Sequence, residues 1–364
     1  MLENYNIKPH ISFMERALSL AKKGRGSVSP NPLVGCVVVK DGEIIGEGYH
    51  EQFGLEHAEV NAFRNSIMSS YDTSVYVNLE PCSISGKTPP CTDFLIGNSV
   101  SEVFISMLDP NPKVNGKGVE KLINSGIDVN VGILNEASLD LNKGYSKWIT
   151  SSRPYVIAKV AQSKNGFIGM SNQERTIITS MDAQDHSHAV RSQVDAILVG
   201  RQTAFIDDPK LTVRNVLGHN PTRVVMDTNR RLSLDLKIFT DNKAKTLVLC
   251  SEDKFEKSST SFCRYMPIRE VNGMLCPFDT LRSLGGQNIT SVLIEGGRSI
   301  LETFFRNDLI DELLIYTSSE NLAGATLVNP IELNDGDWEI VDERILGNDE
   351  VKVMKKKREI CLPV

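Results

Sequence analysis

Three side chains in the first quarter of the chain have the types and the order of a catalytic metal site. His57 is followed by Cys82, which comes directly after Pro81, and then by Cys91. Catalytic zinc keeps three protein ligands, of which one His with two Cys is a permitted set, and leaves its fourth position to water. Bound Zn2+ lowers the pKa of that water from ~15.7 to ~7, so hydroxide is present at neutral pH. The three residues therefore predict a hydrolytic Zn2+ site.

Glu59 lies two residues after His57 and is not needed as a ligand. When hydroxide attacks an amidine-like ring carbon, a proton must be carried to the departing ammonia, and we expect the Glu59 carboxyl to carry it. Zinc nucleobase deaminases have His-x-Glu, then Pro-Cys, then a second Cys after two intervening residues. This chain keeps that order, with eight residues between Cys82 and Cys91. The alternative is a structural zinc with a fourth protein ligand, for which His50 is the nearest candidate.

Two further groups of polar residues have a structural and a chemical interpretation. Pro30 and Pro32 hold Asn31 in a rigid turn, where it either forms the turn or contacts a substrate ring beside the metal. His186 and His188 are two residues apart and lack a Cys or carboxylate partner at ligand spacing, so we expect them on a helix surface.

Composition restricts the class of protein. A chain of 364 residues predicts two domains of ordinary size. A net charge of −6 argues against general nucleic-acid binding, and no apolar run is long enough to span a membrane. The start of the chain lacks the order of a signal peptide, so we expect the seven Cys to be reduced thiols in a cytoplasmic protein.

Regular elements predicted around these residues alternate between helices and strands. The apolar pattern predicts a helix over 11–23 with a capping box at Ser12 to Glu15, a helix over 56–67 with His57 and Glu59 in its first turn, and a helical connector over 135–150. Strands of this half are expected at 34–39, 43–49, 74–79, 100–107 and 127–134, and two further helices at 91–96 and 118–124. The alternation predicts a sheet covered by helices.

The motifs of this half resemble a known family. They are Ser29-Pro30-Asn31-Pro32 with Val34-Gly35, His57-Ala58-Glu59, and Glu80-Pro81-Cys82-Ser83 with Gly86-Lys87-Thr88-Pro89-Pro90-Cys91. Together they look like the pyrimidine deaminase domain of riboflavin biosynthesis. The resemblance implies a cytidine-deaminase-like three-layer α/β/α domain over 1–150 and a substrate contact from Asn31. One departure is Ile84, where the family usually has His.

The second half, over 151–364, resembles the reductase domain of the same family. Strands are expected at 155–161, 195–200, 223–226, 246–250, 291–295, 311–316, 338–341 and 350–354. The strand over 291–295 leads into Gly296-Gly297-Arg298-Ser299 and a helix over 300–305, which is a possible anion cradle. The resemblance implies a dihydrofolate-reductase-like α/β fold.

The resemblance also implies the residues that hold cofactor and substrate. NADPH would be held by Ala161, Thr203, Asp207, Thr228, Gly297, Arg298, Ser299, Ile300, Leu301, Glu302 and Thr303. The substrate would be held by Arg175, Arg191, Leu211, Arg214 and Glu295. A pair of Arg suits a ribose phosphate, because guanidinium groups match its oxygens. Lys159 and Asp207 are the polar groups expected near the hydride step.

The chain is therefore expected to be a bifunctional enzyme with Zn2+ and NADPH as cofactors. The first domain would deaminate a diaminopyrimidinone ribosylamino 5′-phosphate, and the second would reduce the ribosyl to the ribityl chain. Asn165 and Arg175 depart from the family pattern and motivate an alternative, a deaminase with a non-catalytic binding or dimerisation domain. A nucleic-acid deaminase is a third interpretation, disfavoured by the acidity and the long Cys spacing. We expect a homo-oligomer that acts on a small molecule and binds neither nucleic acid nor a membrane.

Overall fold

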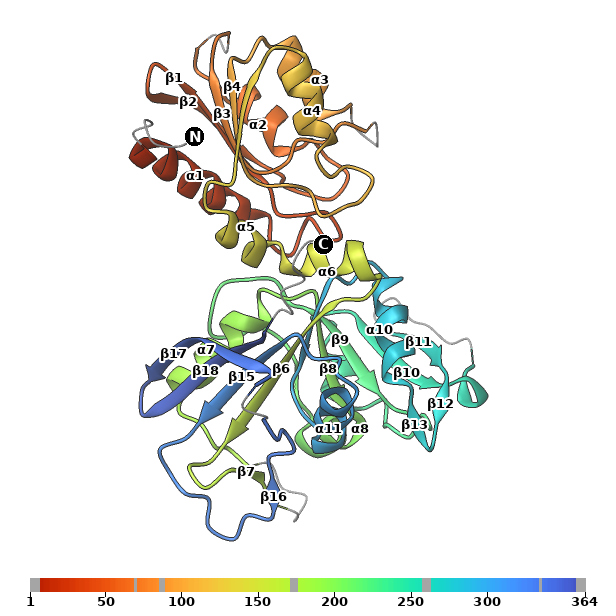
Figure 1. Cartoon of the computed structure of the whole chain (residues 1–364). Coiled ribbons are helices and arrows are strands. Elements are labelled where there is room, and N and C mark those ends of the chain that lie inside the picture. Colours follow the sequence, from red (N-terminus) through yellow and green to blue (C-terminus); the bar gives the residue numbers. More distant parts are fainter. Residues whose placement is uncertain are drawn as a thin grey trace. The chain divides into compact units, whose positions relative to one another are not determined.

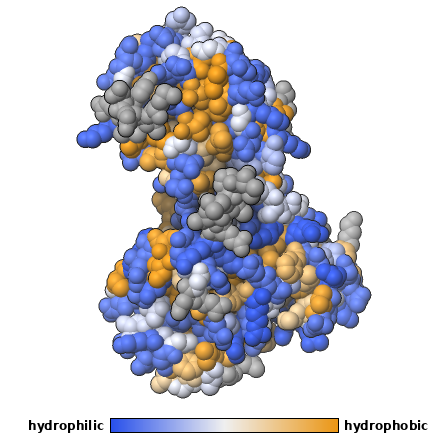
Figure 2. All heavy atoms as spheres, in the orientation of Figure 1, coloured by the Kyte–Doolittle hydropathy of each residue, from blue (hydrophilic) through white to orange (hydrophobic). Residues whose placement is uncertain are grey.

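The computed structural model describes residues 7–68, 71–84, 89–170, 176–256, 263–333 and 336–357. The chain forms two compact units, Met1–Ser152 and Arg153–Val364, each with its own sheet (Figure 1). Hydrophilic residues cover most of the face shown in Figure 2, and hydrophobic residues appear in smaller areas of it. No helix among the described residues is long and apolar enough to cross a membrane.

The N-terminal unit contains a five-stranded sheet with the order β2-β1-β3-β4-β5. Strand β1 pairs antiparallel with β2 and β3, whereas β3, β4 and β5 are parallel. The strands are β1 (Gly35–Lys40), β2 (Glu43–Tyr49), β3 (Ser74–Leu79), β4 (Glu102–Met107) and β5 (Asp128–Val131). The chain leaves β3 and β4 at the same edge of the sheet, because the two strands are parallel.

Helices lie on both faces of this sheet, so the unit has three layers. Alternation along β1 sends Val37 toward Met14 of α1 on one face and Val38 toward Ala62 of α2 on the other. The helices are α1 (Ile7–Ala21), α2 (Ala58–Arg64), α3 (Cys91–Gly97), α4 (Lys117–Asn124), α5 (Asn135–Leu141) and α6 (Lys143–Ser151). The expected three-layer α/β/α class is confirmed.

Three expected boundaries in this unit were wrong. Helix α1 begins at Ile7, so Ser12 lies inside the helix and cannot form the expected capping box. His57 is the residue that precedes α2 rather than a member of its first turn. The connector over 135–150 is two helices separated at Asn142, whose side chain bonds elsewhere in the unit.

The C-terminal unit contains a nine-stranded sheet with the order β11-β10-β9-β8-β14-β6-β15-β18-β17. The first seven strands of this order are parallel, and β18 pairs antiparallel with both of its neighbours, β15 and β17. The strands are β6 (Tyr155–Gln162), β8 (Ala196–Gly200), β9 (Thr222–Met226), β10 (Thr246–Ser251), β11 (Cys263–Ile268), β14 (Ser291–Ile294), β15 (Glu312–Thr317), β17 (Trp338–Leu346) and β18 (Asp349–Lys356). Two small pairs add β7 (Phe167–Gly169) with β16 (Leu327–Val328), and β12 (Glu270–Val271) with β13 (Met274–Leu275).

Helices cover both faces of the larger sheet as well. Val156 of β6 belongs to the core cluster that contains Leu281 of α10 and Phe304 of α11, and Ile157 to the one with Ala183 of α7. The helices are α7 (Met181–Arg191), α8 (Arg201–Asp207), α9 (Lys237–Thr240), α10 (Pro277–Gly285) and α11 (Arg298–Arg306). The neighbouring parallel strands β8, β14 and β6 end at one edge, where open α/β sheets place their ligands.

Candidate metal centre and nucleotide cavity

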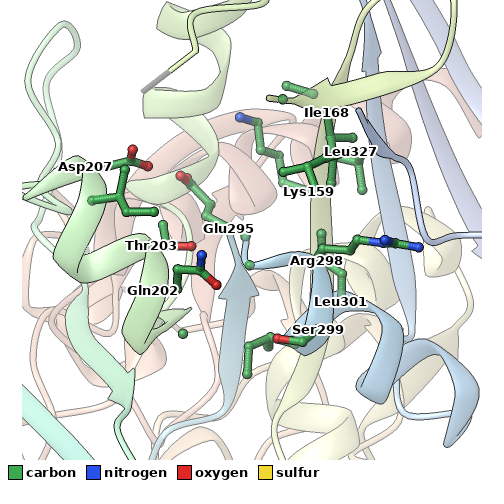
Figure 3. A pocket seen from close by; sticks show the side chains of 18 of the residues that line it. Lys159, Ile168, Gln202, Thr203, Asp207, Glu295, Arg298, Ser299, Leu301 and Leu327 are labelled. Carbon is green, nitrogen blue, oxygen red and sulfur yellow. The ribbon is translucent and has the colours of Figure 1, made fainter. Parts of the chain in front are cut away.

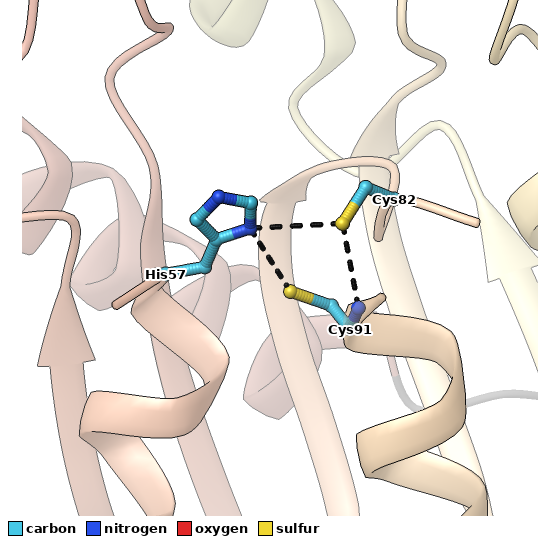
Figure 4. A group of neighbouring side chains, drawn as sticks. All are labelled: His57, Cys82 and Cys91. Carbon is cyan, nitrogen blue, oxygen red and sulfur yellow. Dashed lines mark hydrogen bonds between the residues drawn. The ribbon is translucent and has the colours of Figure 1, made fainter. Parts of the chain in front are cut away.

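The three predicted metal ligands lie together at the end of β3 and the starts of two helices (Figure 4). His57 precedes α2, Cys82 follows β3, and Cys91 is the first residue of α3. One nitrogen of His57 and the two sulfur atoms lie within 4.8 Å of one another. They are the only group of this kind that could hold a metal ion among the residues that the structure describes.

The geometry of these atoms fits a tetrahedral zinc site. The Nδ1 atom of His57 lies 3.2 Å from Sγ of Cys91 and 3.6 Å from Sγ of Cys82. Ligand bonds of ~2.0 Å to nitrogen and ~2.3 Å to sulfur place donor atoms of a tetrahedral site about 3.6 Å apart. The set of donors and their spacing therefore suit zinc and leave one position open.

The electrostatics of the two Cys favour metal binding. A hydrogen bond from the Cys91 thiol lowers the pKa of Cys82 to about 4, and the bonds from His57 and from the Cys91 N–H at 3.3 Å act in the same direction. The pKa of Cys91 is raised by the same shared proton and by burial. One thiolate is thus present at neutral pH, and a metal ion would displace the remaining proton, because the thiolate is the ligand form.

Glu59 is buried in the first turn of α2, beside this group. Burial raises the pKa of its carboxyl, against the opposing charge of His57. Its Oε2 atom has no hydrogen-bond partner among the described residues. A buried carboxyl oxygen without a partner is costly unless a ligand takes it up, so this atom is suited to exchange a proton with a bound molecule.

The structure disfavours a structural zinc with His50 as fourth ligand. His50 is buried, its Nδ1 lies 2.9 Å from the carbonyl oxygen of Glu56, and its Nε2 lies 3.0 Å from Nδ2 of Asn31. Both ring nitrogens are engaged, so neither is available to a metal ion. The His50 ring lies edge to face against the His57 ring with centroids 5.5 Å apart, so His50 links Asn31 to one of the metal ligands.

Glu80 supports the metal centre, and the sequence analysis did not identify it. Its buried carboxylate accepts hydrogen bonds from the N–H groups of Gly116, Gly118 and Asp109 at 3.0, 2.8 and 3.1 Å. These bonds hold the loop between β4 and α4 against the segment that carries Cys82. The Glu-Pro-Cys motif is the signal that could have indicated this role.

A cavity of about 940 Å³ lies in the C-terminal unit (Figure 3). Every residue expected to hold the cofactor lines it, and so do three of the residues expected to hold the substrate, Arg191, Arg214 and Glu295. The volume is at the upper end of the range for small-molecule and cofactor sites.

The segment between β14 and α11 forms one wall of this cavity. Gly296 has φ 122° and Gly297 has φ 82°, which residues with a Cβ rarely adopt. A Cβ on Gly297 would lie 3.4 Å from Oγ1 of Thr203. The turn therefore brings the main chain close to the cavity and presents the N–H groups at the start of α11, where an anion is favoured.

Polar groups gather elsewhere in the cavity, and Figure 3 shows Lys159 and Glu295 extending toward the same space. Arg191 donates to both oxygens of Glu295, at 2.6 Å each. Burial acts against this charge, but Arg191 outweighs it and lowers the pKa of Glu295. Burial lowers the pKa of Lys159. The protonation states of Glu295 and Lys159 therefore depend on burial and on the neighbouring charged groups.

Some expectations for this unit need correction. The guanidinium of Arg191 is paired with Glu295, and both Arg191 and Arg214 line the cavity, so the expected two-arginine phosphate clamp stays a prediction. The side chain of Leu211 packs in the core and does not line the cavity. His188 was expected on a surface, but it is buried in the cavity wall, where burial lowers its pKa to about 4. Arg175 lies outside the described residues.

His186, the second residue expected on a helix surface, is partly buried and also departs from that expectation. Its Nδ1 atom lies 2.7 Å from the hydroxyl of Tyr316, across the contact between α7 and β15. Because an amphipathic helix has one face toward the core, spacing alone did not say which face carried the two histidines.

Asn165 and Ile84, two described residues that differ from the family pattern, have different consequences for the structure. The Oδ1 atom of Asn165 accepts from the hydroxyl of Ser163 at 2.7 Å and from the N–H of Leu322 at 3.1 Å. An Asp would offer the same acceptor, so Asn165 preserves the turn. Ile84 lies close to Cys82 in sequence with an exposed side chain, and it cannot supply the hydrogen bond that His would.

Sequence reasoning missed several residues of the cavity wall. Ile168 and Leu327 come from the β7–β16 pair, Met274 comes from β13, and Gln202 comes from α8. None belongs to a motif, and they meet only because the fold brings their elements together. Lys159, which the sequence analysis did name, differs from these residues because it is the one charged residue within the apolar run of β6.

Two known families match the two units. The family described as the cytidine and deoxycytidylate deaminase zinc-binding region matches residues 7–107. The family described as the RibD C-terminal domain matches residues 154–340. The metal centre lies within the first match, and most of the cavity lies within the second.

Relatives and solved structures extend the match to nearly the whole chain. The riboflavin biosynthesis protein RibD of Aquifex aeolicus (strain VF5) is 35% identical over 96% of this chain and 94% of its own length. RibD of Escherichia coli (strain K12) is 38% identical over 85% and 88%. A Thermotoga maritima crystal structure, titled a diaminohydroxyphosphoribosylaminopyrimidine deaminase/5-amino-6-(5-phosphoribosylamino)uracil reductase, is 33% identical, covers 97% of this chain and 100% of that one, and has a TM-score of 0.86. The chain belongs to the RibD family of riboflavin biosynthesis proteins.

Proposed function

We propose that this chain catalyses both reactions for which its Thermotoga maritima relative is named. The N-terminal unit removes the 2-amino group of 2,5-diamino-6-ribosylamino-4(3H)-pyrimidinone 5′-phosphate as ammonia. The C-terminal unit then reduces the ribosyl side chain to ribityl. The observation that carries the proposal is the convergence of His57, Cys82 and Cys91 beside the unpaired, buried oxygen of Glu59.

The donor set described above fits Zn2+, which His57, Cys82 and Cys91 would hold. When bound, zinc would supply a water of lowered pKa as the nucleophile. Asn31, held at His50 next to these ligands, offers its carboxamide to the edge of the pyrimidine ring. Ring contact is therefore our proposal for Asn31, in addition to its place in the turn.

Glu59 moves the protons of the deamination. Since burial raises the pKa of its carboxyl, a larger fraction carries a proton at neutral pH than for an exposed Glu. The protonated carboxyl donates to the ring nitrogen, and a second proton taken up from the attacking water is passed to the departing amine. A carboxyl with one unpaired oxygen inside the site is suited to this exchange, because a general acid or base must lie within hydrogen-bond reach of the proton that it moves.

The cavity fits NADPH as the reductant, although its lining alone indicates only a nucleotide. NADPH would supply the hydride when bound. The turn of Gly296 and Gly297 and the start of α11 offer N–H groups to its diphosphate, and Thr203 lies against that turn. The positive end of the helix adds to this attraction.

The polar groups of the cavity suit the sugar and phosphate of the substrate. Arg191 keeps the Glu295 carboxylate charged and oriented, and Lys159 faces the same space. His188, uncharged because burial and the neighbouring Arg191 and Arg214 lower its pKa, offers a ring nitrogen without adding charge. Arg191 and Arg214 remain our candidates for the phosphate.

A deaminase with a non-catalytic C-terminal domain is less well supported. Asn165, one departure behind that alternative, still accepts the two hydrogen bonds of its turn. A binding module also has no need for Lys159 and the paired Glu295 and Arg191 in one cavity.

The test is to incubate the purified protein with the diaminopyrimidine phosphate, with and without NADPH, and to identify the products by mass spectrometry. Without NADPH we expect the mass change of one amino group replaced by oxygen, and with NADPH a further gain of two hydrogens. Deamination without the second change would favour the non-catalytic alternative. No mass change in zinc-loaded protein would refute the proposal.

A further inference from the structure

Two buried asparagine side chains hold the main chain of Leu33, two residues after Asn31. Asn142 accepts from the N–H of Leu33 at 2.8 Å and donates to its carbonyl oxygen at 3.0 Å. Asn78 donates to the same carbonyl oxygen at 3.0 Å and accepts from the N–H of Gly35 at 2.8 Å. Both side chains are almost completely buried, with 2% and 0% exposed. Three of these hydrogen bonds thus go to Leu33 and the fourth to Gly35.

These bonds take the place of regular secondary structure. Residues 32–34 belong to no helix or strand, and β1 begins only at Gly35. A carboxamide presents a donor and an acceptor side by side, so Asn142 binds Leu33 as a neighbouring strand would. The N–H of Leu33 depends on Asn142 for its partner, whereas Gly35 depends on Asn78. We call the four hydrogen bonds of Asn142 and Asn78 the asparagine clamp. Removal of Asn142 leaves the N–H of Leu33 without this partner, whereas the N–H of Gly35 keeps its bond to Asn78.

Asn142 comes from a part of the chain that the zinc-binding family does not cover. That match ends at residue 107, whereas Asn142 lies at the break between α5 and α6. Tyr145, one turn later, donates its hydroxyl to Asp109 at 3.0 Å, beside the loop that Glu80 holds. The helical segment after β5 therefore contacts both loops that border the metal centre.

We propose that Asn142 is a positioning residue of the deaminase, which holds the Leu33 main chain so that Asn31 meets His50 beside the metal ligands. The inference rests on the proposed function and deepens it. Asn31 bonds to His50 at 3.0 Å, and the N–H of His50 bonds to the carbonyl oxygen of Val34 at 2.9 Å. The segment from Asn31 to Val34 is thus bonded to His50 at both ends, and Asn142 holds Leu33 between them.

The proposal separates substrate positioning from metal binding. Asn142 contacts no ligand of the metal, so its loss leaves zinc in place. It loosens the group that meets the substrate, so binding of the substrate weakens more than the chemical step. The reductase cavity lies in the other unit, and we expect its reaction to be unaffected.

The experiment compares the full-length protein with Asn142→Ala and Asn142→Asp, and with Asn124→Ala as the control, because Asn124 is an exposed residue at the end of α4. Asn142→Ala removes both hydrogen bonds to Leu33, each of which is worth up to about ten-fold, so we expect the KM of ammonia release to rise at least about ten-fold, with kcat changed less than about three-fold. Zinc content and reduction of the deaminated pyrimidine stay at the wild-type level. Asn142→Asp places a carboxylate against the Leu33 carbonyl oxygen, and we expect a larger rise in KM.

Hydrogen exchange followed by mass spectrometry gives a test that does not depend on activity. In the Asn142 variants the Leu33 amide exchanges faster, while the Gly35 amide, bonded to Asn78, stays protected as an internal reference. Unchanged exchange at Leu33, an unchanged KM, or parallel losses of zinc, kcat and reductase activity would each overturn the proposal. A wild-type protein that releases no ammonia would refute the proposed function. In that case, faster exchange at Leu33 in the variants would show that the asparagine clamp holds the loop, without a role in catalysis.

Discussion

Removal of Arg191 tests the buried pair on which the charge of the reductase cavity depends. Arg191 and Glu295 have side chains only 13% and 6% exposed, and two hydrogen bonds of 2.6 Å join them. In Arg191→Ala the carboxylate stays buried without its partner. Loss of one member of a buried pair costs about 3–5 kcal/mol, which for a unit of this size lowers the midpoint of thermal unfolding by roughly 10 °C.

The loss also has a defined dependence on pH. In the wild type the folded-state pKa of Glu295 is lowered, so the pair stabilises the fold above the unfolded-state value of about 4.3, and this stabilisation is lost as the pH falls through the folded value. In the variant, burial still raises the pKa of Glu295 and only the smaller contributions of Lys159 and His188 oppose it, so we expect a raised folded-state pKa and a carboxyl that destabilises the fold as the pH rises above about 4.3. The difference between the two proteins should therefore be largest at neutral pH and shrink as the pH approaches about 4.

The assay is thermal unfolding between pH 4 and 8, read together with NADPH oxidation on the deaminated pyrimidine. Arg269→Ala is the matched control, because Arg269 is paired with Asp279 in the same unit but is 61% exposed, and a surface pair contributes at most about 1 kcal/mol. The double variant Arg191→Ala with Glu295→Gln should recover much of the lost stability, since the unpaired carboxylate is removed. A loss in Arg191→Ala that is equal at pH 4 and pH 7, or equal to that of Arg269→Ala, would refute the reasoning.

Three further predictions concern the metal centre and the cofactor. Glu59→Gln should keep one zinc per chain by elemental analysis and lose at least about 100-fold in ammonia release, since a proton carrier is removed; full activity would exclude Glu59 as the acid. Cys91→Ser should lose most of its zinc and its deamination while reduction of the deaminated pyrimidine continues, and retention of stoichiometric zinc would contradict the ligand set. Gly297→Val should weaken NADPH binding at least about ten-fold in a fluorescence titration, because its φ of 82° strains a side chain at the turn, whereas Gly286→Ala at φ −64° should bind normally.

The sequence was sufficient where a local pattern determines the structure. Strands β1 and β3 could be located because runs of β-branched and apolar residues end at turn-forming residues. The metal ligands followed from the order of His57, Cys82 and Cys91, since each stands at the end of a predicted element. The cofactor wall depended on the resemblance, because Gly296-Gly297 alone has the pattern of an ordinary turn.

The sequence was not sufficient where a polar side chain finds its partner far along the chain. Arg191 and Glu295 each matched an expected binding residue, but nothing local to either indicates that they pair with one another. His188 was assigned to a surface because helical spacing does not reveal which face of α7 meets the sheet. The same holds for Asn142. The helical pattern over 135–150 did not indicate that the helix is interrupted at Asn142, whose side chain binds the main chain of Leu33.

The partners found only in the structure have one property in common. Glu80, Asn78 and Asn142 are polar residues buried in the N-terminal unit, and each bonds main-chain groups of a loop or of the first residues of the helix or strand that follows it. Burial of such side chains is unfavourable unless every hydrogen bond is made, so they are maintained only where a loop must adopt one conformation. The loops they hold are those that carry Asn31 and border Cys82. We therefore expect substitutions of these three residues to reduce deamination more than they reduce the stability of the unit, which the comparison of KM with the unfolding midpoint in each variant will measure.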